Sequence, residues 1–222
     1  MDETEGKDGE TIVISVGGSL VVPHDINLQF LAKLKSFIEE ETRHGRQFVI
    51  VVGGGSTARK YQNAVRKLSN TEAADVDRIG ITAIKLNVHM MKLIFKDVAP
   101  VLINPGVEEW EPGRSSDHGT VKIAQKYGAK KIVNLSNVDY VYDVKKTDET
   151  GRIVKITDIS WDDFIAMLPH EWTPGANVPF DPQASEFARD IGLEVVSING
   201  QIIDELIKYV HGREFRGTRI HN

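Results

Sequence analysis

The sequence contains no cysteine, which excludes disulfide bonds, iron–sulfur clusters and thiolate nucleophiles. It also lacks a long apolar run, because no stretch approaches the roughly 20 residues that a membrane-spanning helix needs. Basic and acidic residues are nearly balanced, 27 against 32, and no block of lysines and arginines is present of the kind that neutralises a nucleic-acid backbone. These absences predict a cytoplasmic protein that binds neither membranes nor nucleic acids.

The chain does have enough apolar material for one sizeable core, since 41% of its 222 residues are hydrophobic. Its start, MDETEGKDGE, is acidic where a signal peptide would be basic and then apolar, so residues 1–10 are predicted to form a disordered tail. Residues 11–222 are predicted to form a single α/β domain.

Two apolar segments, Thr11–Val16 and Gln47–Val52, are typical of strands that helices cover on both faces. Between them the apolar residues recur at helical spacing, from Phe30 to Ile38. This order of elements predicts a parallel sheet with crossover helices. Further helices are predicted near 57–65, 77–96, 120–127, 161–168, 182–191 and 202–210, and further strands near 100–103, 131–135, 193–198 and 217–220.

Each of the first two strands ends in glycines followed by a small hydroxyl residue. The first turn is Gly17-Gly18-Ser19, and the second is Gly53-Gly54-Gly55, followed by Ser56. Glycines without a Cβ atom let backbone N–H groups approach an anion, and a helix that begins after them adds its positive dipole end. One such turn can hold a polyphosphate, so two predict a donor and an acceptor that meet between them.

Two common nucleotide-binding motifs fit less well. The segment GGGSTA, residues 53–58, matches the G-x-G-x-x-G/A fingerprint of dinucleotide-binding folds. That fold has one glycine turn after its first strand and an acid at the end of the second, whereas here both strands end in glycine. The P-loop motif G-x-x-x-x-G-K-S/T does not occur in the chain.

Charged residues near these turns are candidate ligands, each with a structural alternative. Arg59 follows Gly55 by one helical turn and either reaches back to an anion or is an exposed helix arginine. Asp117 ends the turn-rich segment Pro112–Asp117 and either organises Mg²⁺ beside a phosphate or belongs to a capped loop. Side chains that follow the strand near 131–135 lie where open α/β sheets bind ligands, although Asp139 there fits a hydrogen-bonded turn better.

Six segments in a fixed order make a more specific pattern than any one of them. They are GGS, GGG-x-x-A-R-K-Y, D-x-I-G-I with L-N on the same helix, P-G-x-S-S-D, N-V-D-x-V-Y-D and D-P-x-A. Between Thr11 and Ile220 this set resembles the amino-acid kinase superfamily and is most similar to uridylate (UMP) kinases of the archaeal type. The resemblance implies a three-layer αβα sandwich with a mainly parallel central sheet. It also implies transfer of the ATP γ-phosphoryl group to UMP with Mg²⁺, in pyrimidine nucleotide biosynthesis, by a homo-oligomer that is usually a hexamer.

The resemblance also implies roles for individual residues. An acceptor-side lobe would span about 11–118 and an ATP-side lobe about 119–222. Catalytic roles fall to Arg59, Asp117 and Ser19. The residues implied in ATP binding are Gly17, Gly18, Ser19, Gly55, Arg59, Asn137, Tyr142 and Asp143. The residues implied in UMP binding are Gly54, Asp77, Gly113, Arg114, Ser115, Ser116 and Asp117. No residue is assigned as a direct metal ligand, because Mg²⁺ would arrive with ATP.

The chain departs from the family pattern in several places. Ser15 and Asn134 stand where many members have lysines, so Arg59, Lys85, Arg114 or Mg²⁺ must supply positive charge. Tyr140 replaces a glycine. Between the long helix and Pro112 the chain is shorter than the family by roughly twenty residues. Either the acceptor side is trimmed or the sequence omits residues.

These departures leave two alternatives to a UMP kinase. One is a nucleotide-binding or scaffold protein that has lost acceptor binding and catalysis, and the other is a kinase for a small carboxylate, carbamate or alkyl phosphate. Arg59 together with Asp77 favours UMP, because a phosphorylated acceptor with a ribose needs a cation and a group that accepts hydroxyl hydrogen bonds.

Overall fold

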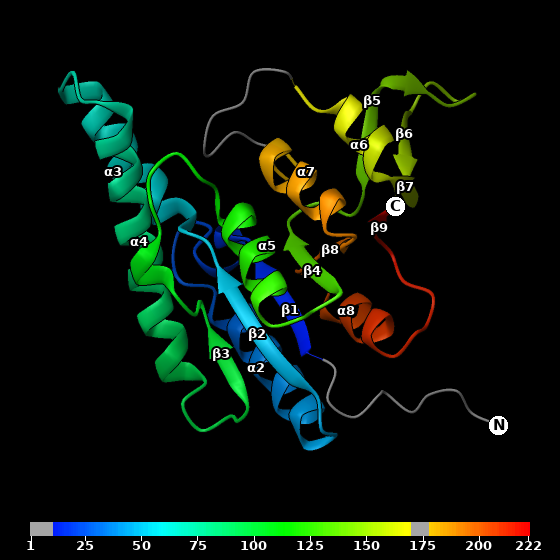
Figure 1. The fold of residues 1–222 in the computed structure, drawn as a ribbon, viewed down its shortest axis with the longest axis horizontal. Coiled ribbons are helices and arrows are strands. Elements are labelled where there is room, and N and C mark those ends of the chain that lie inside the picture. The colour runs from blue at the N-terminus through cyan, green and yellow to red at the C-terminus, as the bar shows by residue number, and fades with distance from the viewer. Residues whose placement is uncertain (1–10, 170–177) are drawn as a thin grey trace.

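The computed structural model describes residues 11–169 and 178–222 (Figure 1). The predicted disordered tail at residues 1–10 and most of the proline-rich loop before Asp181 lie outside the described residues. Within the described part of the chain, no helix combines the length and the apolarity needed to cross a membrane.

A seven-stranded sheet in the order β3-β2-β1-β4-β8-β9-β7 forms the centre of the fold. All neighbouring strands are parallel except β8 and β9, which are antiparallel. Its strands are β1 (Thr11–Val16), β2 (Gln47–Val52), β3 (Val101–Ile103), β4 (Lys131–Ser136), β7 (Asp158–Ser160), β8 (Glu194–Asn199) and β9 (Thr218–His221). A separate antiparallel pair is formed by β5 (Val141–Thr147) and β6 (Ile153–Ile156).

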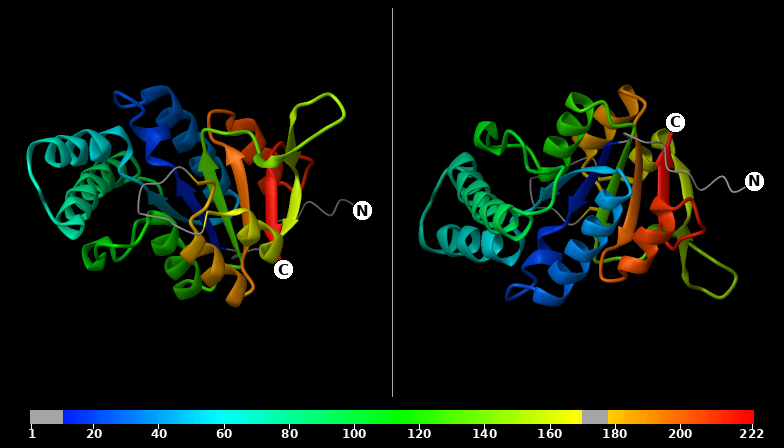
Figure 2. Two further views of the ribbon diagram at one scale, coloured as in Figure 1. Left: turned by 90° about the horizontal axis from the view of Figure 1, so that it is seen from above. Right: turned by 90° about the horizontal axis from the view of Figure 1, so that it is seen from below.

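Helices cover both faces of this sheet. They are α1 (Gly18–Val21), α2 (Leu28–Arg43), α3 (Gly55–Leu68), α4 (Ala73–Ile94), α5 (Ser116–Lys126), α6 (Trp161–Met167), α7 (Pro182–Asp190) and α8 (Ile203–Val210), with a short 3₁₀ helix at Val107–Glu109. Figure 2 shows α2 and α8 on one side of the sheet, α5 and α7 on the other, and α3 with α4 beyond the β3 end. The predicted three-layer αβα sandwich is thus confirmed.

Alternate residues of the central strands enter two separate cores. Ile14, Val16 and Ile50 pack in the core beneath α2 and α8. Val13 and Val49 pack in the core on the opposite face, beneath α5, α6 and α7. Because successive side chains of a strand point to opposite faces, a strand covered on both sides must be apolar throughout. This is why the first two strands read as continuous apolar runs.

Several helix boundaries follow from capping side chains. Asn27 Oδ1 accepts a hydrogen bond from Phe30 N–H at 3.1 Å at the start of α2. Asp181 Oδ1 accepts one from Ala184 N–H at 2.8 Å, and Pro182 occupies the first turn of α7. The Asp-Pro pair therefore starts a helix as predicted, since the cap satisfies a free donor and proline needs none there.

The β5–β6 pair, β7 and α1 were not predicted from the sequence. Val144 and Ile153 in the β5–β6 pair are 75% and 51% exposed, so this hairpin buries little apolar surface and leaves no clear pattern. The long helix α4 begins at Ala73, one turn before the predicted start at 77.

Candidate functional site

The two glycine turns are in direct backbone contact. In the parallel register Val16 lies beside Val52, so β1 and β2 end at the same level. Gly53 N–H donates to Val16 O at 3.1 Å. A Cβ atom on Gly18 would lie 2.1 Å from the Gly55 nitrogen, and Gly55 has a φ of +64° that other residues rarely adopt. Glycine is therefore required on both sides of this contact.

A cavity of about 230 Å³ opens between the glycine turns, the first half of α4 and the start of α5. It is lined by Gly18, Ser19, Gly53, Gly54, Gly55, Ala58, Arg59, Gln62, Asp77, Gly80, Ile81, Ile84, Arg114, Ser115 and Ser116. The N-termini of α3 and α5 lie in its wall, at Gly55 and Ser116. Free N–H groups and helix dipoles at these ends favour an anion in the cavity.

Arg59 is the cation that this cavity leaves available. It is exposed, lines the cavity, and makes no hydrogen bond or ion pair with any residue of the described ranges 11–169 and 178–222. Arg114 also reaches the wall, but its guanidinium donates to Gln183 Oε1 on α7. Lys85 lies elsewhere on α4 and forms an ion pair with Glu108 at 2.6 Å. Of the three predicted cationic side chains, Arg59 is thus the one that lines the cavity without a partner in the described part of the chain.

Asp77 connects α4 to the predicted acceptor segment. Its Oδ2 accepts a hydrogen bond from the Gly113 N–H at 3.0 Å, and Gly113 has a φ of +85°. Asp77 and Arg59 line the same cavity although they come from different helices. The structure therefore brings together the two residues on which the preference for UMP depends.

Asp117 lies in the first turn of α5 and is not one of the residues that line the cavity. Its Oδ2 accepts a hydrogen bond from the backbone N–H of Asp181 at 3.2 Å. Asp181 in turn accepts a hydrogen bond from the Ser115 hydroxyl. The pKa of the Asp117 carboxyl is raised to about 7, mainly because burial penalises its charged form and secondly because the Asp181 carboxylate is close. The hydrogen bond from the Asp181 N–H lowers the pKa and so partly offsets these two effects. Among the described contacts, Asp117 thus joins α5 to the start of α7.

This raised pKa predicts a pH-dependent stability that Asp117→Asn removes. Below about pH 4 the Asp117 carboxyl is protonated in both the folded and the unfolded state. Between about pH 4 and about pH 7 only the unfolded state ionises, so the free energy of unfolding falls as the pH rises through this range. One proton changes the free energy of unfolding by at most about 1.4 kcal/mol per pH unit. Urea denaturation should find Asp117→Asn more stable than the unmodified protein at pH 8 and similar to it at pH 4. Asp25→Asn, at an exposed position, is the control, and an equal pH profile for Asp117→Asn and the unmodified protein would contradict the prediction.

The residues predicted to frame the ATP base and ribose lie at the same edge of the sheet but outside the cavity wall. Asn137 is exposed directly after β4, and Tyr142 in β5 is 41% exposed. Asp143 is buried and forms an ion pair with Lys146 at 3.0 Å. Asp139 accepts a hydrogen bond from Asn199 at 2.7 Å, in agreement with the structural role favoured for it.

The positions that depart from the family pattern have local explanations. Ser15 and Asn134 are partners in the register of β1 and β4, and Asn134 donates to Pro179 O at 2.9 Å. Tyr140 packs edge-to-face against Tyr142, with ring centroids 6.4 Å apart, and Lys155 Nζ lies 5.1 Å from its ring centroid. Its bulk is therefore accommodated by the β5–β6 pair.

Sequence reasoning missed Gln62, Ile81 and Ile84 as wall residues. The two isoleucines follow the helical period of α4 and were assigned to its core face. Gln62 Nε2 donates to Val76 O at 3.1 Å, and a Cβ atom on Gly80 would lie 2.6 Å from Gln62 Nε2. Only the close packing of α3 on α4 turns these side chains into cavity walls, so no local pattern could have identified them.

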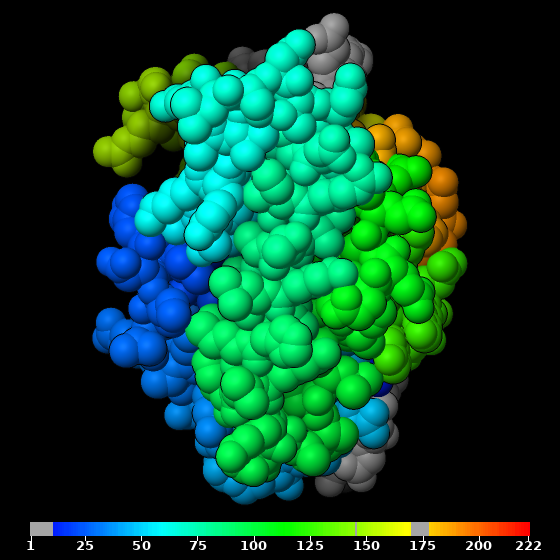
Figure 3. Space-filling model, turned by 90° about the vertical axis from the view of Figure 1, so that its left-hand side faces the viewer, coloured from blue at the N-terminus to red at the C-terminus, as the bar shows by residue number. Residues whose placement is uncertain are grey.

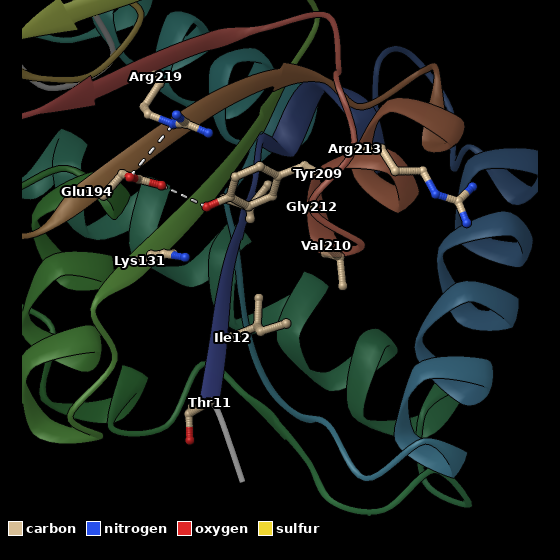
Figure 4. A pocket seen from close by; sticks show the side chains of 10 residues that line it. Thr11, Ile12, Lys131, Glu194, Tyr209, Val210, Gly212, Arg213 and Arg219 are labelled. Atoms are coloured by element: carbon tan, nitrogen blue, oxygen red, sulfur yellow. Dashed lines mark hydrogen bonds and ion pairs between the residues drawn. The ribbon is translucent and has the colours of Figure 1, made fainter. Parts of the chain in front are cut away.

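A second cavity, of about 330 Å³, lies at the opposite edge of the sheet, where the strands begin (Figure 4). Thr11, Lys131 and Glu194 are the first residues of β1, β4 and β8 there. Glu194 accepts a hydrogen bond from the Tyr209 hydroxyl at 3.0 Å and lies 3.7 Å from Arg219 Nε. The glycine turns, Arg59 and Asp77 take no part in this cavity.

Comparison with known proteins assigns the family. The profile of the amino acid kinase family matches residues 10–102 and 99–199. The chain belongs to the amino acid kinase family. A uridylate kinase of Methanobrevibacter smithii is 29% identical over 229 residues and covers 94% of this chain and 98% of its own. One of Methanocorpusculum labreanum is 27% identical over 228 residues and covers 95% of each chain.

Solved structures in the same family have the same fold. The uridylate kinase from Archaeoglobus fulgidus superposes with a TM-score of 0.72 at 24% identity, over 94% of this chain and 99% of its own. The UMP kinase from Bacillus anthracis superposes with a TM-score of 0.75 at 17% identity, over 96% of each chain.

The alignments with relatives and the family profile contain interruptions. The alignment with the M. labreanum relative runs over 228 positions, more than the 222 residues of this chain, so it includes positions at which this chain has no residue. The family profile matches in two stretches that meet at 99–102, where β3 begins. This break lies in the region between the long helix and Pro112 that was predicted to be short.

Proposed function

We propose that this member of the amino acid kinase family is a uridylate kinase that transfers the γ-phosphoryl group of ATP to UMP and forms UDP. The observation that carries the proposal is the cavity in which two glycine turns, Arg59 and Asp77 converge. The names of the relatives and their coverage of nearly the whole chain support it. This reaction would make the protein a transferase of pyrimidine nucleotide biosynthesis.

In this proposal the donor and acceptor phosphates meet above the touching glycine turns. Backbone N–H groups at Gly18 and Ser19 bind the ATP phosphates, while Gly17 lines this turn with its own N–H donated to Leu135 O at 2.8 Å. The N–H groups of Gly54 and Gly55 bind the transferring group and the UMP phosphate. Arg59 holds both phosphates in line and offsets their charge, since phosphoryl transfer needs alignment and charge stabilisation more than covalent chemistry. Ser19 adds a hydroxyl donor on the ATP side.

The acceptor nucleotide is held on the other side of the cavity. Asp77 keeps one carboxylate oxygen on the Gly113 N–H, which leaves the other available to a ribose hydroxyl. Arg114, Ser115 and Ser116 then face the UMP phosphate and sugar from the start of α5. On the ATP side, Asn137, Tyr142 and Asp143 would contact the base and ribose. Asp117 acts through Asp181 and Ser115 by holding this segment in place.

The proposed reaction uses Mg²⁺ bound to ATP. The described residues contain no group of at least three histidine, aspartate or glutamate side chains that could hold a metal by themselves. Such a site fits an ion whose oxygen ligands come largely from nucleotide phosphates and water, as Mg²⁺ prefers. Bound there, the ion neutralises charge on the phosphates.

We also infer a cytoplasmic homo-oligomer, with a hexamer as the form suggested by the family resemblance. Apolar side chains exposed on α3 and α4 support a subunit contact: Leu68, Leu86 and Leu93 are 88%, 62% and 71% exposed. These two helices make up much of the face shown in Figure 3. Large apolar side chains gathered on one face often mark an interface.

Turnover with individual nucleoside monophosphates tests the proposed function. Purified protein with Mg·ATP is expected to release ADP with UMP at least about fivefold faster than with CMP, AMP or GMP, since a buried group left without its hydrogen bond to the base costs about 1 kcal/mol or more. EDTA should abolish the release. ATP binding without turnover of any acceptor would instead support a non-catalytic protein, and turnover with carbamate or an alkyl phosphate would support a different acceptor.

A further inference from the structure

A buried asparagine on α4 binds the second glycine turn. Asn87 is 3% exposed and lies next to Val88, within a helix face that is otherwise apolar. Its Nδ2 donates a hydrogen bond to the Gly53 carbonyl at 2.8 Å. An amide buried among apolar side chains is unfavourable unless it is hydrogen-bonded, so the bond to Gly53 accounts for a polar residue at this position.

A second buried asparagine holds the strand end just before this turn. β3 pairs with β2 only as far as Ile50 and Ile103. Beyond that point Asn104 Oδ1 accepts from Val52 N–H at 2.8 Å, and Asn104 Nδ2 donates to Val52 O at 3.2 Å. Asn104 thus makes with its side chain the two hydrogen bonds that a longer β3 would make with its backbone. These two hydrogen bonds hold the backbone of Val52 in place, so the remaining backbone freedom of the turn lies in the glycines that follow.

The hydrogen bond from Asn87 determines how the peptide between Gly53 and Gly54 is oriented. In a trans peptide the C=O and the following N–H point in opposite directions, so a Gly53 carbonyl directed at α4 turns the Gly54 N–H away from α4. Gly54 lies in the cavity wall, and its N–H donates to no other residue of the described part of the chain. Two adjacent glycines tolerate both orientations of this peptide, because neither has a Cβ atom to oppose a flip.

We propose that Asn87 is a positioning residue for phosphoryl transfer, which prevents this peptide from flipping and keeps the Gly54 N–H available to a phosphate oxygen. The inference rests on the proposed function and adds a role for the L-N motif that the sequence comparison left without one. A flipped peptide would present the Gly53 carbonyl to the phosphate instead, so a donor would be replaced by a repelling acceptor.

The proposal is tested with Asn87→Asp, which keeps the shape but loses the donor, and with Asn87→Ala. Both are expected to lower kcat with UMP by about 100-fold, the smaller end of the effect of losing one preorganised donor to a transition state. Val88→Ala is the control, because it removes buried volume from the neighbouring position of α4 without touching the turn. Val88→Ala should lower Tm about as much as the Asn87 variants do. Its kcat should stay within about twofold of that of the unmodified protein, because the N–H donors of the glycine turn remain in place. All rates are compared at a temperature where circular dichroism shows each variant folded.

A measurement without turnover separates this proposal from the proposed function. With ¹⁵N-glycine-labelled protein, inorganic pyrophosphate should shift the Gly54 amide resonance of the unmodified protein and of Val88→Ala, but not that of Asn87→Asp. If the unmodified protein shows this shift, Asn87→Asp lacks it and UMP is not turned over, Asn87 still positions the Gly54 N–H for a phosphate while the uridylate kinase assignment fails. If folded Asn87 variants show the same shift and the same kcat as the unmodified protein, Asn87 has no positioning role.

Discussion

Arg59→Ala is expected to lower the rate of UMP phosphorylation by about 10³-fold, the smaller end of the range for arginines that stabilise a transferring phosphoryl group. Arg59 lines the cavity beside the glycine turns and has no partner in the described parts of the chain. Its fork is therefore available to two phosphate oxygens at once. Steady-state ADP release at saturating Mg·ATP and UMP measures the loss.

Two further variants show whether the fork or only the charge matters. Arg66→Ala removes the same charge from α3 two turns further along, where the side chain is exposed, and should keep nearly full activity. Arg59→Lys keeps the charge without the bidentate geometry, so its rate of UMP phosphorylation should lie between those of Arg59→Ala and Arg66→Ala. Because Arg59 supports no other part of the described fold, its removal should leave Tm almost unchanged. Near-normal activity of Arg59→Ala would remove this residue from the site.

Gly18→Ala is expected to abolish measurable activity and to destabilise the protein by about 2 kcal/mol or more, as overpacked sites do. The added Cβ atom would lie 2.1 Å from the Gly55 nitrogen and 2.7 Å from the Gly53 carbonyl carbon. These neighbours are backbone atoms that cannot rotate away. The two turns would have to separate, and the donor and acceptor phosphates would no longer meet. Tm and ADP release together measure both effects.

Gly212→Ala is the matched control for this substitution. Gly212 has a φ of +67°, and a Cβ atom there would meet no atom within 4 Å. Alanine at this position carries only the penalty of a left-handed backbone, about 1–2 kcal/mol, and should leave kcat unchanged. If Gly18→Ala proved as active as Gly212→Ala, the contact between the turns would be unimportant for catalysis.

The predicted elements that matched the structure are those with a strong local signal. The bounds of β1, β2, α2 and α7 were predicted within a few residues. Strands that are buried on both faces are apolar throughout, and a helix that begins with Asp-Pro has a recognisable first turn, so both leave clear patterns in the sequence. The β5–β6 pair was missed because many of its side chains are exposed, and β7 was missed because it has only three residues, so burial imposes little pattern on them.

Residue types and motif order also pointed to several residues that line the candidate cavity, but they did not show which side chains reach it. Arg59 and Asp77 line the cavity, whereas Lys85 forms an ion pair with Glu108. Asp117 is turned toward Asp181 instead of the cavity. A charged side chain near a motif can point into the ligand cavity or pair with another side chain. Which of these occurs depends on residues that are remote in the sequence.

The sequence by itself determined the parallel α/β sheet, the two glycine turns and the family, because these depend on patterns that are local or that keep a fixed order along the chain. Only the tertiary structure decided that Gly18 touches Gly55, that Asn87 holds Gly53, and that Asn104 completes the pairing of β2 where β3 is short. These contacts join residues more than 30 positions apart, and such pairs are set by the register of the sheet and the packing of α4 against it.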